Sequence, residues 1–97
     1  MAQMRLRWTS LALKDLDSAR EYVNAENPAA AARTIERIEE ATKLLQTYPN
    51  LGREGRVEDT RELVIAHTPF IIAYRVGKSQ IEIVSVVHAA RRWPSSF

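Results

Sequence analysis

The sequence predicts a two-layer α+β fold in which an N-terminal helical hairpin packs on a mainly antiparallel four-stranded sheet. Three observations predict it: a short strand-like segment opens the chain, two stretches of helical periodicity follow, and the last third alternates β-branched and aromatic residues between turn signals. The expected order is therefore βααβββ. Its 97 residues suffice for one small core, so we expect a single domain over residues 1–97.

The first half of the chain supplies the strand and the hairpin. Met4–Trp8 alternates apolar and basic residues, which is typical of a strand with one buried face. Thr9 or Ser10 can cap a helix that continues with helical spacing to about Asn24.

A second helix is predicted from Pro28 to about Gln46. Asn27 is a favourable cap, and a proline at the first helical position loses an N–H that has no partner there. Its apolar stripe, spaced for packing on another layer, comprises Ala31, Ile35, Ile38, Ala41 or Thr42, Leu45 and Tyr48.

Three further strands are predicted, over Arg61–Ile65, Phe70–Val76 and Gln80–Val87. A turn at residues 67–69 separates the first two, and the glycine and lysine at 77–78 form a tight hairpin before the last. The helical hairpin therefore precedes an antiparallel meander, and the first strand is available to pair at its edge.

Composition excludes several kinds of protein. Cysteine is absent and the two histidines lie far apart, so we expect no disulfide, no cysteine nucleophile, no metal and no cofactor. No apolar run approaches the roughly 20 residues that span a bilayer, and Met1 to Trp8 lacks the apolar region of a signal peptide, so we expect a cytoplasmic protein without a membrane partner.

The net charge of +2 is unevenly distributed. Residues 1–48 hold 7 basic and 7 acidic side chains, whereas residues 49–97 hold 7 basic and 5 acidic ones. A local basic surface of this kind suits phosphate or an acidic protein partner, and a merely solvated surface is the plain alternative. The candidate target- or phosphate-binding residues are Arg53, Arg56, Arg61, Arg75, Arg91, Arg92 and Trp93.

No self-sufficient catalytic or nucleotide-binding motif is present. Arg53 and Arg56 alternate with glycines in the loop after the second helix, a pattern that can meet phosphate but equally suits a connecting loop. His88, at the end of the last strand, can act as a general acid or base or be structural. Tyr74 is predicted to lie in the core.

The whole chain resembles the RelE/ParE superfamily of toxins from type II toxin–antitoxin modules. Its length and element order match, and the resemblance is carried by residues 12–16, 27–28, 52–56, 60–63, 68–76 and the tail with His88 and 91–94. The resemblance implies plasmid stabilisation and growth inhibition as the biological setting, and an acidic antitoxin as partner. The basic surface and the exposed sheet edge suit such a partner, by strand addition or by a helix in a groove.

Two activities occur on this fold, so the family name alone does not give the function. RelE-like members are ribosome-dependent mRNA endonucleases, whereas ParE-like members inhibit DNA gyrase without a nuclease site. Against the RelE pattern, the expected strand arginine falls at Ile71 and the expected lysines fall at Glu62 and Val64. Arg91, with His88 nearby, does match, and these two would be catalytic if the chain is a nuclease.

The segment from Thr68 to Val76, followed by a strand that ends in Val-Val-His, is closer to ParE-type sequences. The resemblance therefore favours gyrase as the target, with the mRNA endonuclease and an inactive antitoxin-binding relic as alternatives. Trp93 and Phe97 either anchor the same contact or fold back on the sheet.

Overall fold

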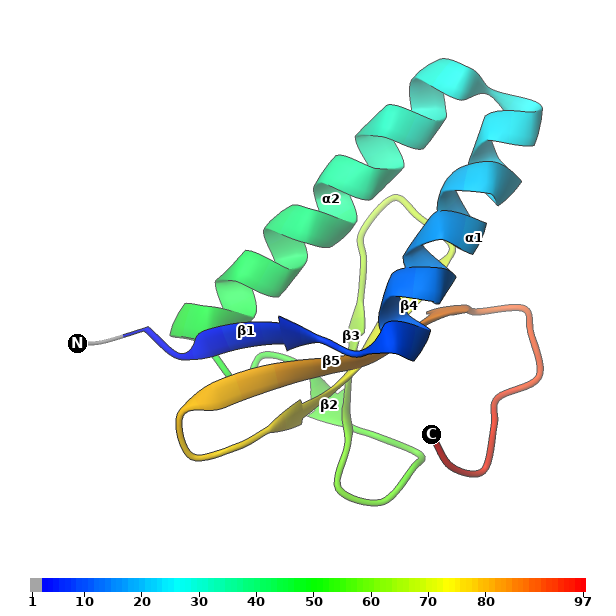
Figure 1. Cartoon of the computed structure of the whole chain (residues 1–97). Coiled ribbons are helices and arrows are strands. Elements are labelled where there is room, and N and C mark those ends of the chain that lie inside the picture. The colour runs from blue at the N-terminus through cyan, green and yellow to red at the C-terminus, as the bar shows by residue number, and fades with distance from the viewer. Residues whose placement is uncertain (1–2) are drawn as a thin grey trace.

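The computed structural model describes residues 3–97. Both helices lie on one side of a single sheet, and the chain after the last strand runs as an extended tail (Figure 1). The elements are β1 (Arg5–Trp8), α1 (Ser10–Glu26), α2 (Pro28–Thr47), β2 (Arg53–Glu54), β3 (Arg61–Val64), β4 (Phe70–Val76) and β5 (Gln80–His88). This confirms the predicted two-layer α+β fold.

The sheet has five strands in the order β1-β5-β4-β3-β2. β1 pairs with β5 in parallel, and all other pairs are antiparallel. The prediction gave four strands; the additional one, β2, is only two residues long and lies in the segment that was expected to be a loop. Glycines flank β2 on both sides, which left no strand pattern to recognise.

Both helices begin at the expected caps. The Thr9 side chain accepts a hydrogen bond from the amide of Ala12 (3.1 Å), and Asn27 accepts from the amides of Ala29 (3.1 Å) and Ala30 (3.2 Å). Asn27 alone separates the two helices, so the hairpin connection is shorter than the sequence indicated. Neither helix, within residues 3–97, is long and apolar enough to cross a membrane.

The core lies between the helices and one face of the sheet. The apolar stripe of α2 meets alternate residues of the central strands, and Tyr74 is fully buried, as predicted. The prediction that Tyr48 belongs to this stripe was wrong: Tyr48 is 59% exposed, because α2 ends at Thr47 and Tyr48 leaves the helical face as its C-cap residue. The largest fully buried side chains of the core include Ile38, Leu45, Ile72, Tyr74, Ile81 and Ile83.

β1 pairs with only the first half of β5, and α1 provides hydrogen-bond partners for the second half. β1 pairs only as far as Trp8 with Ile83, and beyond that point the Asp15 carboxylate of α1 accepts hydrogen bonds from the Val86 amide (3.1 Å) and the Ser85 hydroxyl. The edge amide is thereby satisfied without a neighbouring strand. Asp15 therefore fixes α1 on the sheet.

β5 contains an irregularity that reverses which residues face the helices. Tyr74 pairs with Ile83 and Ala73 pairs with Ser85, so Val84 has no partner on β4. An extra residue shifts the alternation of all later side chains by one. His88, which pairs with Phe70, therefore lies on the helix-covered face.

Candidate functional site

The two faces of the sheet have different contents. On β4, Phe70, Ile72 and Tyr74 point to the helices, so Ile71, Ala73 and Arg75 point to the other face, here called the open face. Register places the remaining candidates on one face or the other. Arg61 and His88 lie on the helix-covered face, whereas Glu62, Arg53 and Arg75 lie on the open face.

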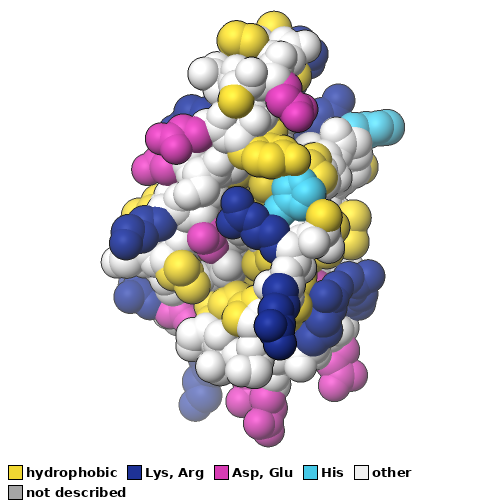
Figure 2. All heavy atoms as spheres, turned by 90° about the vertical axis from the view of Figure 1, so that its right-hand side faces the viewer, with side chains coloured by type: hydrophobic (Ala, Val, Ile, Leu, Met, Phe, Trp, Pro, Cys, Tyr) yellow, Lys and Arg dark blue, Asp and Glu magenta, His cyan; other side chains and the backbone are white. Residues whose placement is uncertain are grey.

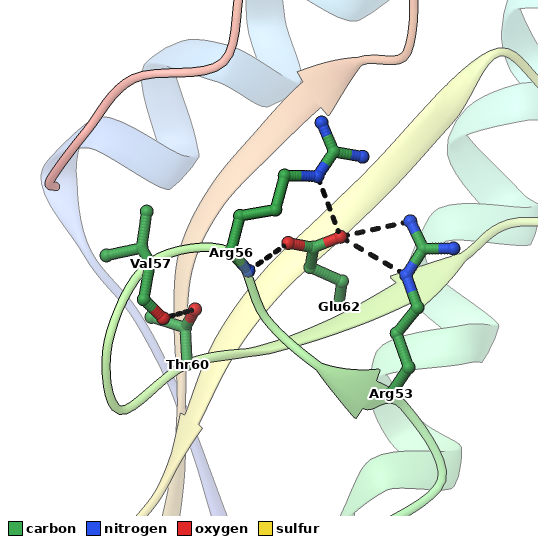
Figure 3. Close-up of polar contacts among 5 residues, drawn as sticks. All are labelled: Arg53, Arg56, Val57, Thr60 and Glu62. Atoms are coloured by element: carbon green, nitrogen blue, oxygen red, sulfur yellow. Dashed lines mark hydrogen bonds and ion pairs between the residues drawn. The ribbon is translucent and has the colours of Figure 1, made fainter.

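A buried carboxylate forms the centre of the open face. The Glu62 side chain is 1% exposed, and its Oε1 contacts Nη2 of Arg53 at 3.0 Å and Nε of Arg56 at 3.5 Å. Oε2 accepts the backbone amide of Arg56 at 2.7 Å (Figure 3). Arg53 Nε also donates to Oε1, at 3.3 Å, and these four N–H partners offset the cost of burying this charge. The loop that follows β2 is thus held down on β3.

The sequence left two interpretations of the arginines in the loop after the second helix, phosphate binding and a plain connection, and the structure shows features of both. Arg53 belongs to β2 and Arg56 follows it, and both use part of their hydrogen-bonding capacity on Glu62. Their side chains remain 55% and 52% exposed, so outward N–H groups stay accessible. Sequence reasoning placed Glu62 only as a departure from a nuclease pattern. The sequence feature that could have identified Glu62 is an acidic residue within a predicted strand that follows an arginine-rich loop.

A second carboxylate on the open face also lies between two arginines. Glu82 of β5 forms ion pairs with Arg7 of β1 and with Arg75 of β4, the latter at 3.6 Å. Glu82 is 23% exposed, and the two arginines are 59% and 37% exposed. Arg75 was predicted as a site residue, whereas Arg7 was considered only as part of the first strand.

Arg61 has a structural contact on the opposite face. Its Nη1 donates to the Gly52 carbonyl at 2.7 Å, beside Tyr74. The Tyr74 hydroxyl donates to the Pro49 carbonyl and accepts from the Gly52 amide, both at 2.8 Å. Burial raises the pKa of Tyr74 above its usual 10.0, and the Gly52 hydrogen bond and the Arg61 charge partly offset this. Tyr74 is fully buried and its hydroxyl joins two backbone groups, so its role is structural.

His88 and Arg91 lie together at the start of the tail. The His88 ring forms T-shaped contacts with Phe70 and Tyr22, and its Nδ1 accepts a hydrogen bond from the amide of Ala90 at 3.1 Å. The Arg91 amide donates to the His88 carbonyl at 3.0 Å, and both side chains line a small cavity of about 10 Å³. The His88 ring thus stabilises the turn at residues 88–91, where the tail begins.

The tail folds back on the protein through aromatic side chains. The Arg56 guanidinium lies 4.1 Å from the Trp93 ring centroid, a cation–π contact, and Trp93 meets the edge of Phe97. Arg92 and Phe97 help to line a groove of about 260 Å³ between the tail and α1. Basic side chains gather around the tail on this side of the molecule (Figure 2). Trp93 and Phe97 therefore fold back on the protein in the chain alone, and their part in a partner contact stays a prediction.

The predicted site residues thus form separate groups. Arg53, Arg56 and Trp93 meet through Glu62 and the loop; Arg75 joins Arg7 and Glu82; Arg61 lies behind the sheet; and His88 and Arg91 lie at its far end. Within residues 3–97, no group of three or more histidine, cysteine or acidic side chains is arranged to hold a metal ion. The arrangement provides oriented cations, which bind anions, rather than an assembled acid–base pair.

This fold with an arginine-rich surface defines a small basic α+β domain, and comparison with known proteins identifies its family. The family described as "ParE toxin of type II toxin-antitoxin system, parDE" matches residues 6–93. The chain therefore belongs to the ParE toxin family, which confirms the resemblance to the RelE/ParE superfamily, and it is a ParE-type toxin of a type II toxin–antitoxin system.

Similar proteins carry both names of the superfamily. The chain is 46% identical over 94 residues to "Putative toxin Y4kP" of Sinorhizobium fredii, with 97% of each sequence covered. It is 39% identical over 84 residues to "Toxin RelE2" of Caulobacter vibrioides, covering 87% of this chain and 93% of the relative. A solved chain from the chromosomal ParDE system of P. aeruginosa superimposes with a TM-score of 0.81 at 30% identity, covering 89% of this chain and 96% of that one.

Proposed function

We propose that this toxin arrests growth by inhibiting DNA gyrase and that a cognate antitoxin neutralises it. One observation carries the choice of target: the open face has a buried carboxylate, Glu62, at a position where the nuclease pattern has a lysine. The arginine of that pattern is replaced by Ile71, which is 5% exposed. A nuclease that stabilises a developing charge on phosphorus needs cations at these places.

The position of His88 supports the same choice. A general acid or base must reach the scissile phosphate together with the stabilising cations. His88 lies on the helix-covered face between two aromatic rings, whereas Arg53 and Arg56 lie on the open face. The sheet separates His88 from Arg53 and Arg56, so Arg91 is the candidate cation that lies beside it. This fits a protein that acts by binding its target.

A surface for the proposed antitoxin lies beside α2. A groove of about 310 Å³ is lined by residues of α2 and β3, and its exposed apolar side chains include Leu44, Leu51 and Val64. β2 pairs only with Arg61 and Glu62, so the outer edge of β3 is unpaired at Leu63 and Val64. An apolar groove next to a free strand edge suits a helix followed by an added strand.

The target is tested by inducing the chain in a bacterial host and following labelled thymidine and labelled methionine incorporation over the first minutes. We expect DNA synthesis to fall first, and a purified chain to block supercoiling by gyrase. An earlier fall in protein synthesis would replace this function with mRNA cleavage. No change in either would make the chain a relic that only binds an antitoxin.

Two substitutions make this test sharper. His88→Ala and Arg91→Ala remove the two residues that would be catalytic in a nuclease, so gyrase inhibition should persist in both. Arg33→Ala on the exposed surface of α2 is the matched control for loss of a charge. Loss of toxicity in His88→Ala with its fold intact would contradict the proposal.

A further inference from the structure

The open face repeats one arrangement twice. Glu62 holds Arg53 and Arg56, and Glu82 holds Arg7 and Arg75. In both cases the carboxylate is the more buried partner, with 1% and 23% exposure, whereas the four arginine side chains are 37% to 59% exposed. Each group of two arginines and one glutamate carries a net charge of 2 − 1 = +1. The negative charge faces inward and the positive charge faces outward.

The two groups form a diagonal line across the sheet. Glu62 pairs with Ala73, and Glu82 pairs with Arg75, two residues further along β4. Arg53 lies on β2 at one edge and Arg7 lies on β1 at the other, four strand intervals apart. With strands about 4.8 Å apart, the basic line is roughly 20 Å long.

The carboxylates orient the guanidinium groups before any ligand arrives. A carboxylate engages one part of each planar group and leaves the other N–H donors directed at solvent. Such a group can still form paired hydrogen bonds with phosphate oxygens, and fixing it in advance lowers the entropy cost of binding. The four arginines thus form a rigid array of phosphate-binding groups.

We propose that this array, Arg7, Arg53, Arg56 and Arg75 on the open face, binds the sugar–phosphate backbone of duplex DNA. The inference rests on the proposed function, since gyrase acts on duplex DNA and a toxin bound there lies beside that substrate. The array neither requires nor provides recognition of bases, because contacts to phosphates carry no sequence information.

The composition of the face favours a duplex over other anionic partners. A single strand is usually held by several aromatic side chains that stack on successive bases, and the strand residues that point to this face include no aromatic side chain. Trp93 of the tail lies against the array, but one face of its ring is covered by the Arg56 guanidinium. An acidic peptide would need apolar surface for its side chains. The apolar residues at the centre of the face, Ile71, Ala73 and Val87, are at most 8% exposed. The regular row of phosphates on a duplex needs neither aromatic rings for stacking nor exposed apolar surface.

The direct test is fluorescence anisotropy with a labelled duplex of about 20 base pairs, at several salt concentrations from about 50 mM upward. Arg7→Gln/Arg75→Gln should weaken binding about tenfold and reduce the slope of log affinity against log salt by about 2. The control Arg20→Gln/Arg33→Gln removes the same charge from the exposed helix surfaces and should change affinity less than about twofold.

A second variant should act in the opposite direction. Glu82→Gln removes the negative charge between Arg7 and Arg75 and should tighten duplex binding about twofold, since the remaining charge is screened but close to phosphate. A variant that merely unfolds cannot produce tighter binding. Thermal unfolding followed by circular dichroism checks that every variant is folded.

Three results would overturn the inference. These are no duplex binding at about 50 mM salt, an equal loss in both double variants, or competition by poly-glutamate or duplex RNA as strong as that by duplex DNA. The anisotropy experiment contains no gyrase, so its outcome is independent of the proposed function. A chain that binds duplex DNA through these arginines but leaves gyrase active keeps the site and loses the proposed target.

Discussion

The helix-covered face and the open face of this sheet are built from alternate residues of the same strands, yet they solve different problems. On β4, Ile72 and Tyr74 join a dry core under two helices, whereas Ala73 and Arg75 face a surface organised by buried carboxylates. The covered face obtains stability from apolar burial. The open face buries carboxylates, which costs stability, and these carboxylates orient the charged groups that a binding surface requires.

The largest expected difference between the faces concerns two neighbouring isoleucines. Ile72→Ala should lower the free energy of unfolding by about 3 to 4 kcal/mol, because the cavity lies in a fully enclosed core. Ile71→Ala on the open face should cost about 2 kcal/mol, because Ile71 lies outside the main core cluster that encloses Ile72. Urea unfolding followed by circular dichroism measures both. Equal losses would mean that the open face is a second core.

The two glutamates of the open face should differ in the same experiment. Glu62→Gln should cost about 2 kcal/mol, because it weakens charge-assisted hydrogen bonds to a carboxylate that is only 1% exposed. Glu82→Gln should cost less than about 1 kcal/mol, since Glu82 is 23% exposed and its ion pairs lie near solvent. A larger loss at Glu82 would show that the β1 side of the face depends more on its ion pairs.

An effect between those of the two glutamates is expected for the buried polar group of the covered face. Tyr74→Phe leaves the Pro49 carbonyl and the Gly52 amide without their partner and should cost about 1.5 kcal/mol at neutral pH. Equilibrium unfolding at pH 7 measures this loss. A cost near zero would show that water replaces the hydroxyl.

The same variant has a pH signature. Burial raises the pKa of Tyr74, so above about pH 10 the unfolded chain loses this proton before the folded chain does. Its contribution to stability is therefore complete below that pH and is lost as pH rises through the folded pKa. Tyr74→Phe should show a shallower decline in unfolding free energy at alkaline pH than the parent chain. Parallel declines would contradict a raised pKa.

The sequence by itself determined the elements and their order. Caps such as Asn27, the helical stripe of α2 and the alternation in β4 are local patterns, and the structure has helices and strands within a few residues of the predicted bounds. Local patterns also predicted that Tyr74 is buried. These patterns follow the periodicity of a helix or a strand, and that periodicity does not depend on which residues are neighbours in the tertiary structure.

Only the tertiary structure decided which candidate residues meet. The unpaired residue Val84 places His88 on the helix side, away from the arginines of the open face. Arg53 and Arg56 are oriented by Glu62, six or more residues further along the chain, and Arg7 reaches Glu82 across a parallel strand pair. Register and bulges arise from the balance of packing across the whole sheet, so no local pattern encodes them.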